Sequence, residues 1–455
     1  MQIKNPRYSI VIPTFERENL LEGTIAGCLL QDYDDFELLI SNNFSKDNTE
    51  FVLAKYNNNS KVRIVRTDRK LSMPDHWAFA MTHARGDYIL FLGDDDGISP
   101  RFFKIIDDVI NLTSSNIIKF KTGLFYHSDW SGIDKNTFHF DSRSTGGIFN
   151  VDIDCVITSF CDFTDYKYFP SLLTCVFRRD LYLAANKVVD QVFVGAPDHT
   201  AAFLLLSQPE ARLGYIDMVL GYGGRSENSN ASFYAVKERK SNEKKSRHTE
   251  WASELTSKTS LPHHQPNITT PANFLPAAFS YAKFFYPARF STFSLNHLEL
   301  CKVIQRDLVD CLIGRRPAWH SLPELANFNS FVHTHLNETE KELLFKVGEQ
   351  HSVVGRIRIL IKRGYIFLSG LLTKIHIFNI ELYRARNAQK RVFDTRIDLS
   401  HQDVVTGHDL MGNFDKLICS RLSSSSGSAL DLTSQSVSLM GHVEISKPNF
   451  RIYAA

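Results

Sequence analysis

Three consecutive aspartates, Asp94, Asp95 and Asp96, directly follow the apolar run Tyr88-Ile-Leu-Phe-Leu92. Adjacent carboxylates repel one another, so such a cluster is costly unless a cation or strong hydrogen-bond donors lie beside it. Divalent cations such as Mg²⁺ and Mn²⁺ take carboxylate oxygens as ligands and can neutralise an anionic leaving group. Aspartate is also common in solvated turns and at helix N-caps. The triplet therefore indicates either a cation site or a structural turn.

The chain around this run alternates between two periodicities. Short apolar runs predict buried strands at residues 8–13, 36–41, 62–66 and 87–92. Apolar residues at helical spacing predict helices at 18–31, 48–56, 73–84 and 102–112. Further on, strands are expected at 116–125, 171–178 and 213–222, and helices at 152–163 and 198–206. This order predicts an α/β fold with a parallel sheet covered by helices on both faces.

Polar loops follow three of the predicted strands, at residues 13–17, 41–47 and 93–99. In an open parallel sheet, ligands bind outside the carboxyl ends of the strands. We therefore expect these three loops to lie on one rim of the sheet and to form a single binding site.

The three rim segments resemble the motifs of family 2 glycosyltransferases. They read Ser9-Ile-Val-Ile-Pro-Thr-Phe-Glu-Arg17, Ile40-Ser-Asn-Asn-Phe-Ser-Lys-Asp47 and Gly86-Asp-Tyr-Ile-Leu-Phe-Leu-Gly-Asp-Asp-Asp96. They stand in the family's order, and the resemblance extends over residues 7–225. It implies a GT-A fold and an inverting glycosyltransferase of the hexosyltransferase type. It also implies a nucleotide-diphosphate sugar donor, Mn²⁺ or Mg²⁺ as cofactor, and a glycan or lipid-linked acceptor.

The resemblance implies that Pro13, Thr14 and Arg17 line the nucleotide pocket, with Arg17 as a partner of base or phosphate. Asn42, followed by Asn43, stands where the family usually has Asp in contact with the uracil base. An asparagine amide can both donate and accept hydrogen bonds, so base binding is still expected. The alternatives are a solvent-facing Arg17 at a helix start and plain turn chemistry for the two asparagines.

The acidic run also departs from the family pattern, because Gly93 stands where the family often has an acid. By the resemblance, Asp95 matches the metal ligand, and Asp94 matches an acid near the ribose or the metal's water shell. Asp96 is expected either as a third ligand or as a cap of the following helix.

An inverting transfer needs a base that takes the proton of the acceptor hydroxyl. The family carries this acid at the start of a helix, and Asp198 matches it, although Pro197 replaces the usual preceding Glu. The alternative for Asp198 is a helix cap, and His199 beside it is an acceptor-binding or structural residue. Asp75 and His76 are secondary candidates for a place near the donor sugar or diphosphate.

The chain is expected to divide into a catalytic domain (1–235), a linker (236–261), a mostly helical accessory domain (262–391) and a tail without assigned structure (392–455). The loop 225–230 is read either as a lid over the donor or as a linker.

Residues 353–391 mix basic and apolar residues, which is typical of a helix on an anionic membrane surface or of a packed helix whose basic face is exposed to water. No apolar stretch approaches the roughly 18–20 residues of a membrane span, so we expect a cytoplasmic protein, either free or peripheral on the inner face of the cell membrane.

Composition narrows the remaining classes. The 52 basic and 50 acidic residues give a net charge of +2, which argues against a nucleic-acid binder. The seven cysteines form no C-x-x-C pair, so reduced, packed thiols are expected. A sugar-1-phosphate nucleotidyltransferase would need a glycine-rich loop after the first strand, and residues 13–17 contain no glycine. A degenerate GT-A domain kept for glycan binding or complex assembly remains the alternative to an enzyme of surface-polysaccharide synthesis, such as that of O-antigen.

Overall fold

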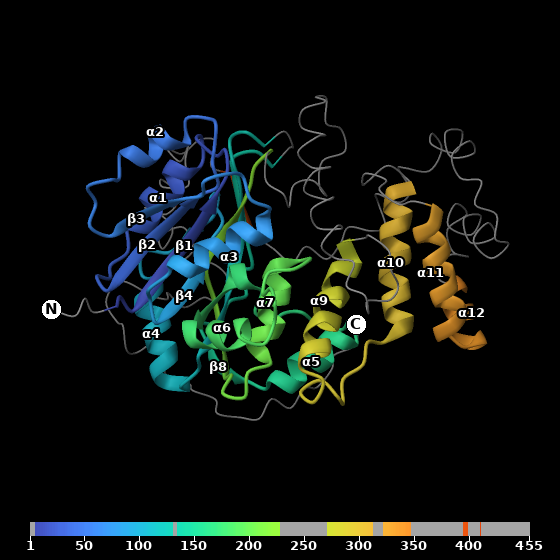
Figure 1. Cartoon of the computed structure of the whole chain (residues 1–455). Helices are drawn as coiled ribbons and strands as arrows, with labels where there is room; N and C mark the ends of the chain where they lie inside the picture. The colour runs from blue at the N-terminus through green and yellow to red at the C-terminus, as the bar shows by residue number, and fades with distance from the viewer. Residues whose placement is uncertain are drawn as a thin grey trace. The chain divides into compact units, whose positions relative to one another are not determined.

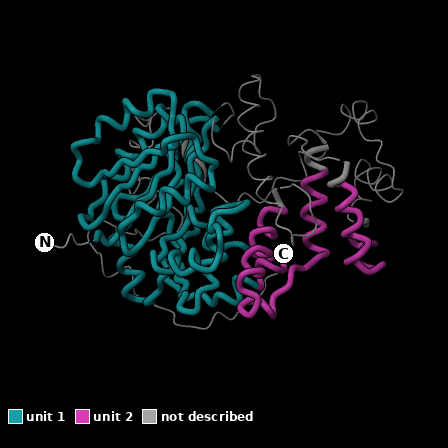
Figure 2. Tube along the Cα trace, viewed as in Figure 1, with its two compact units in different colours: residues 1–157, 166–232, 392–455 teal, residues 158–165, 233–391 magenta. Residues whose placement is uncertain are grey.

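The computed structural model describes residues 5–130, 134–227, 271–312, 322–346, 395–398 and 410 (Figure 1). The chain divides into two compact units (Figure 2). The first comprises residues 1–157, 166–232 and 392–455, and the second comprises residues 158–165 and 233–391. The first unit contains the sheet, and the described part of residues 233–391 is helical.

Among the residues that the structure describes, the sheet of the first unit contains eleven strands. They are β1 (Tyr8–Thr14), β2 (Phe36–Asn42), β3 (Val62–Arg66), β4 (Tyr88–Phe91), β5 (Gly97–Ile98), β6 (Ile117–Tyr126), β7 (Thr137–Phe140), β8 (Ile148–Val151), β9 (Cys175–Arg178), β10 (Leu213–Arg225) and β11 (Thr395–Asp398). Their order is β11-β7-β6-β9-β4-β1-β2-β3, and β10 pairs with β5, β6 and β8.

The prediction of a parallel sheet holds for β3, β2, β1 and β4 but not for the whole sheet. Strand β9 runs antiparallel to both of its neighbours, β4 and β6. It therefore begins beside the end of β4. The strand predicted at 171–178 is shorter than expected, because a 3-10 turn occupies Leu172–Thr174 and β9 starts only at Cys175. The sequence also missed β5, β7 and β8, which are two to four residues long and too short to show a period.

Helices cover both faces of this sheet, as predicted (Figure 1). They are α1 (Leu21–Leu29), α2 (Thr49–Ala54), α3 (Met73–His83), α4 (Phe102–Thr113), α5 (Ile153–Cys161), α6 (Arg179–Asn186) and α7 (Pro197–Leu206). The central strands are apolar on both sides because each of their faces packs against a helical layer.

Alternate residues of β4 show the two layers. Leu90 faces a buried core that also contains Ile25 of α1 and Phe102 of α4. Phe91 points to the other face, where its ring lies 4.6 Å from that of Trp77 of α3. Full burial of such a side chain stabilises the fold by about 1.5–3 kcal/mol. The two layers therefore fix β4, and with it the acidic run that follows.

The described helices of the second unit are α9 (Pro271–Phe285), α10 (His297–Leu312), α11 (Leu322–His335) and α12 (Glu338–Lys346). Leu300, Ile304, Phe328, Phe331 and Leu344 form part of a separate core between the last three. Within the part of the chain that the structure describes, no helix is both long and apolar enough to cross a membrane. The predicted linker 236–261 and the basic segment 353–391 lie outside the described residues.

Candidate functional site

The loops after β1 and β2 are joined by hydrogen bonds on the predicted rim. Pro13 and Thr14 end β1, the Asn43 N–H donates to the Thr14 carbonyl at 2.9 Å, and the Glu16 N–H donates to Ser45 Oγ at 2.9 Å. Glu16 and Phe44 hold φ angles of +53° and +59°, a region that side chains other than glycine rarely adopt. Such backbone persists where surrounding contacts over-determine it, often beside a functional site.

Asn42, which departs from the Asp expected by the resemblance, and Asn43 beside it both have partners inside the protein. Asn43 Nδ2 donates to the Leu71 carbonyl at 2.9 Å, and its Oδ1 accepts from the Leu71 N–H at 2.8 Å. Asn42 Nδ2 donates to Glu50 Oε1 at 2.5 Å, and its Oδ1 accepts from the Ser45 N–H at 3.1 Å. An aspartate has no donor for either first contact. Both amide side chains therefore suit their local hydrogen-bond partners, and contact of either asparagine with a base stays a prediction.

The acidic run forms a tight turn whose last carboxylate folds back. Asp96 Oδ2 accepts from the Gly93 N–H at 2.9 Å, and Asp96 Oδ1 accepts from the Gly224 N–H at 2.8 Å. A Cβ at position 93 would lie 2.7 Å from Asp96 Oδ2, which explains the glycine there. The alternative of Asp96 as a helix cap is wrong, because α4 begins at Phe102 with Arg101 at its N-cap.

Burial governs the ionisation of this turn. Burial raises the pKa of Asp96 to about 7, with a further contribution from the charge of Asp95, while the N–H groups of Gly224 and Gly93 act in the opposite direction. Burial likewise raises the pKa of Asp94 to about 6, although Arg17 lowers it. The turn therefore holds negative charge only at some cost in the absence of further cations.

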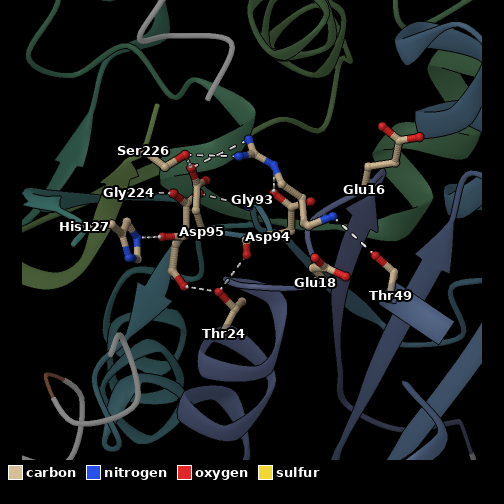
Figure 3. Close-up of polar contacts among 12 residues, drawn as sticks. Glu16, Glu18, Thr24, Thr49, Gly93, Asp94, Asp95, His127, Gly224 and Ser226 are labelled. Carbon is tan, nitrogen blue, oxygen red and sulfur yellow. Dashed lines mark hydrogen bonds and ion pairs between the residues drawn. The ribbon is translucent and has the colours of Figure 1, made fainter. Parts of the chain in front are cut away.

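Arg17 supplies a cation between the first two carboxylates of the run. Its Nε lies 3.3 Å from Asp94 Oδ1, and its Nη2 lies 3.8 Å from Asp95 Oδ2. Its Nη1 donates to Ser226 Oγ at 3.0 Å, and the Ser226 hydroxyl donates to Asp95 Oδ2 at 3.3 Å (Figure 3). The Arg17 side chain is only 12% exposed, so the alternative of a solvent-facing arginine is wrong. Burial would lower the pKa of this guanidinium, but the charges of Asp94 and Asp95 raise it instead.

Residues from distant segments hold the backbone of the run in place (Figure 3). Thr24 Oγ1 of α1 contacts the carbonyls of Asp94 and Asp96 at 3.0 and 3.1 Å. His127 Nε2, just beyond β6, lies 2.9 Å from the Asp95 carbonyl. Sequence reasoning missed Thr24, His127 and Ser226, because single polar residues far apart in the chain leave no motif.

The glycines at the end of β10 lie against the acidic run. The strand predicted at 213–222 is longer than expected, because β10 continues to Arg225 and takes in the first residue of the predicted loop 225–230. A Cβ at Gly224 would lie 2.0 Å from the Asp95 carbonyl oxygen, so the strand needs glycine to approach the acidic run. Glycine inside a strand often marks such a close approach. Residues 228–230 of the predicted lid lie outside the described residues.

Asp198 is the second residue of α7, as predicted, and its carboxylate has partners of its own. The Ser171 hydroxyl donates to Asp198 Oδ2 at 2.7 Å, and His199 Nδ1 lies 3.0 Å from Asp198 Oδ1. Burial acts to raise the pKa of Asp198, but His199 and the Ser171 hydroxyl outweigh it and lower the pKa below its usual value. Asp198 is therefore ionised at neutral pH.

Sheet topology brings Asp198 to the same edge as the acidic run. Ser171 lies at the start of the 3-10 turn that leads into β9. Because β9 is antiparallel to β4, its beginning lies beside the end of β4, where the acidic run starts. The two candidate groups, more than a hundred residues apart in the chain, therefore share one rim of the first unit.

The secondary candidates on α3 are held in other ways. The Ser72 hydroxyl donates to Asp75 Oδ2 at 2.6 Å, and Gln191 Nε2 donates to Asp75 Oδ1 at 3.0 Å. His76 Nε2 lies 2.9 Å from Ser41 Oγ, and burial lowers the pKa of His76 to about 4. His76 is thus a neutral interior residue, and Asp75 closes the N-terminal turn of α3.

The chemistry of the donor set decides whether this rim fits a divalent cation. No group of three or more Asp, Glu, His or Cys side chains in the described ranges is arranged to hold a metal. Mg²⁺ in phosphate sites, however, is often bound by one or two carboxylates together with substrate phosphates. Asp94 and Asp95 already converge on one cationic group, so this pair fits such a site. Asp96 fits less well, because both its oxygens accept backbone hydrogen bonds.

Comparison with known proteins finds similarity in the segment that contains the three rim loops. Residues 9–115 match the sequence profile of Glycosyl transferase family 2. A Campylobacter jejuni GalNAc(5)-diNAcBac-PP-undecaprenol beta-1,3-glucosyltransferase is 29% identical over 93 residues, which are 20% of this chain and 30% of that protein. The Escherichia coli UDP-Glc:alpha-D-GlcNAc-diphosphoundecaprenol beta-1,3-glucosyltransferase WfgD is 28% identical over 88 residues, 19% of this chain and 34% of that protein. The chain thus spans about a third of the length of these relatives.

Among solved structures, the Staphylococcus aureus protein TarS, residues 1–349, in complex with UDP-GlcNAc aligns over 83% of this chain and 92% of that chain. The two are 14% identical, with a TM-score of 0.47. The matched motifs and the sheet that carries them define the first unit as a GT-A fold. Residues 9–115 of this chain are thus similar to glycosyltransferase family 2.

Proposed function

We propose that this chain is an inverting glycosyltransferase that moves a sugar from a nucleotide-diphosphate donor to the hydroxyl of a glycan or lipid-linked acceptor. One observation carries the proposal: two sets of carboxylates whose pKa values are shifted in opposite directions share one rim of the sheet. Asp94 and Asp95 converge on a cation, and Asp198 is an ionised carboxylate with its own donors. Departure of a diphosphate and deprotonation of an acceptor require these two kinds of group.

On the donor side, Asp94 and Asp95 would hold Mn²⁺ or Mg²⁺, with Arg17, Pro13 and Thr14 around the nucleotide. The bound cation would neutralise the diphosphate leaving group. The similarity of residues 9–115 to glycosyltransferase family 2 supports the use of a divalent ion. Because the Arg17 guanidinium is planar and carries five donors, it is also suited to a phosphate.

On the acceptor side, Asp198 would take the proton of the attacking hydroxyl. Ser171 and His199 fix its orientation, and the amino terminus of α7 favours its negative charge. A positioned general base contributes roughly 10²–10⁴-fold to the rate. The lowered pKa of Asp198 keeps the carboxylate free of a proton at neutral pH.

The acceptor class is inferred from the relatives. Two of them are named for acceptors built on diphosphoundecaprenol. We therefore expect a lipid-linked glycan in surface-polysaccharide synthesis, of which O-antigen is one example, and an enzyme at the cytoplasmic face of the membrane. Residues 353–391 would make the membrane contact, and pelleting with anionic vesicles tests it: unchanged pelleting after neutralisation of their basic residues would contradict this role.

The alternative is a degenerate domain that binds glycans or assembles complexes. It is favoured by one observation, namely that Arg17 fills the space between Asp94 and Asp95. In that case the domain would bind no donor in a cation-dependent manner.

A turnover assay separates the two functions. Purified protein is given a panel of nucleotide sugars with Mn²⁺ and lipid-linked acceptors, and nucleotide release is measured. The enzyme predicts release from one donor, strongly reduced in Asp198→Asn. Asp180→Asn is the matched control, because Asp180 is also the second residue of a helix but pairs with Arg178 at the opposite sheet edge. Absence of release from every donor would favour the degenerate domain.

A further inference from the structure

The contacts of Arg17 carry a further inference, which rests on the proposed function. Arg17 contacts both carboxylates of the proposed cation site, and Ser226 completes its shell. Ser226 also contacts Asp95 Oδ2, so guanidinium, hydroxyl and carboxylate form a closed group. Arg17 thus partly neutralises the acidic pair with a cation of the protein itself.

This arrangement is incompatible with a divalent ion bound by the same oxygens. Ligand oxygens lie about 2.0–2.1 Å from Mg²⁺, and a guanidinium held between the same carboxylates would repel the ion at short range. Arg17 must therefore leave Asp94 Oδ1 and Asp95 Oδ2 before these oxygens can act as ligands.

A guanidinium that leaves these carboxylates needs another anion. A buried cation without a partner is costly, because its charge is desolvated and uncompensated. The donor itself brings such an anion, since a diphosphate accepts bidentate hydrogen bonds from arginine. The exchange of partners is therefore favourable only when the nucleotide and the divalent ion arrive together.

We propose that Arg17 serves as the cation of the acidic run before the donor binds, and that donor binding displaces Arg17 from it. Nucleotide and divalent ion then bind cooperatively. The movement involves the side chain, because the backbone is fixed on both sides. The Arg17 N–H donates to Thr49 Oγ1 at 3.3 Å, and the preceding Glu16 is held at a φ of +53°. Arg17 thereby excludes free divalent ions from the site until a nucleotide is present.

The test measures Mn²⁺ binding directly, by electron paramagnetic resonance of the free ion, with and without the nucleoside diphosphate that binds best. Wild-type protein should bind Mn²⁺ weakly alone and about 5- to 150-fold more tightly with the nucleotide, the usual range of coupling between two sites. Arg17→Gln should bind Mn²⁺ tightly without nucleotide and lose most of this coupling. Arg7→Gln is the matched control, because Arg7 pairs with Asp107 at the other end of β1 and should leave the coupling unchanged.

Two results overturn the inference and are distinguishable. If Arg17→Gln, shown to be folded by its melting curve, binds Mn²⁺ like the wild type in both conditions, the role of Arg17 is wrong while the proposed function stands. If no variant binds Mn²⁺ even with nucleotide, the cation site fails and the inference fails with it. If Arg17→Gln does not fold, Ser226→Ala replaces it as the test variant, because it removes one contact of the guanidinium. This variant should bind Mn²⁺ alone a few-fold more tightly than the wild type. Unchanged binding of Mn²⁺ in folded Ser226→Ala would also contradict the inference.

Discussion

The acidic run after β4 and Asp198 at the start of α7 both place buried carboxylates on one rim of the sheet. The pKa values of Asp94 and Asp96 are nevertheless raised, whereas the pKa of Asp198 is lowered. Burial raises the pKa values of Asp94 and Asp96 to about 6 and about 7. At Asp198 burial acts in the same sense, but His199 and the Ser171 hydroxyl reverse it and lower the pKa. Burial alone therefore does not determine the ionisation of a site; the number and charge of its immediate partners do.

Under the proposed function, this contrast suits the two groups to different tasks. Three neighbouring acids with one arginine still lack positive charge, so the run is suited to accept a cation. Asp198 is a single carboxylate whose negative charge is stabilised by two partners, Ser171 and His199. It is therefore suited to stay ionised and to accept a proton only during the reaction. The predictions below test this division, from the largest expected effect to the smallest.

The largest effect is expected for Asp198→Asn. If Asp198 is the base, the substitution should lower kcat by roughly 10²–10⁴-fold while the donor still binds with nearly unchanged Kd. Steady-state kinetics and calorimetry on the same preparation measure the two quantities. Near-normal turnover would show that Asp198 is only a helix-start residue.

Gly224→Ala tests the close approach of β10 to the acidic run. The new Cβ would fall 2.0 Å from the Asp95 carbonyl oxygen, so strand or turn must shift, and we expect a loss of about 1–3 kcal/mol in unfolding free energy. Gly223→Ala is the control, because its Cβ meets nothing closer than 3.9 Å. Denaturant unfolding compares them, and equal stability of the two variants would contradict the packing described here.

Ser171→Ala should affect the base without touching the donor side. Loss of the hydroxyl leaves Asp198 short of one donor, which costs about 1–3 kcal/mol for a buried group. The pKa of Asp198 should rise, so the acid limb of the kcat profile should move to higher pH while donor Kd stays constant. A purely structural role for Ser171 would change stability and leave the pH profile where it was.

The smallest expected effect is a different pH dependence of donor affinity, which depends on Asp94, and of kcat, which depends on Asp198. Carboxylates must be deprotonated to hold a cation, and the pKa of Asp94 is about 6 in the free protein. Mn²⁺-dependent donor affinity should therefore weaken as pH falls below about 6, by at most tenfold per unit for one proton. Over the same range kcat at saturating donor should not fall through Asp198, whose pKa is lowered below its usual value. Parallel loss of both would contradict the assignment.

The sequence predicted the parts of this site that are local in the chain. Strand and helix periodicity located β1, β2, β4 and α7, because both faces of these strands and most of α7 are buried. Three motifs at strand ends then predicted the rim. The family resemblance also marked Asp198, which lies in the first turn of the apolar helix α7.

The partners of these residues could not be predicted. Ser226 lies 131 positions from Asp95, and Gly224 lies 128 positions from Asp96. These pairings depend on the register of β10 beside β6 and on the reversal of β9, which no short pattern encodes. The folded-back carboxylate of Asp96 likewise depends on space above Gly93, so its role emerged only from the structure.

Cation-dependent nucleotide binding at Asp95 tests the central claim most directly. Nucleoside diphosphates are titrated calorimetrically into wild-type protein and Asp95→Asn, with and without Mn²⁺. The account predicts that one nucleotide binds the wild type, that Mn²⁺ tightens this binding, and that Asp95→Asn loses the Mn²⁺ effect. Binding that is equally tight without Mn²⁺ and in Asp95→Asn would contradict it.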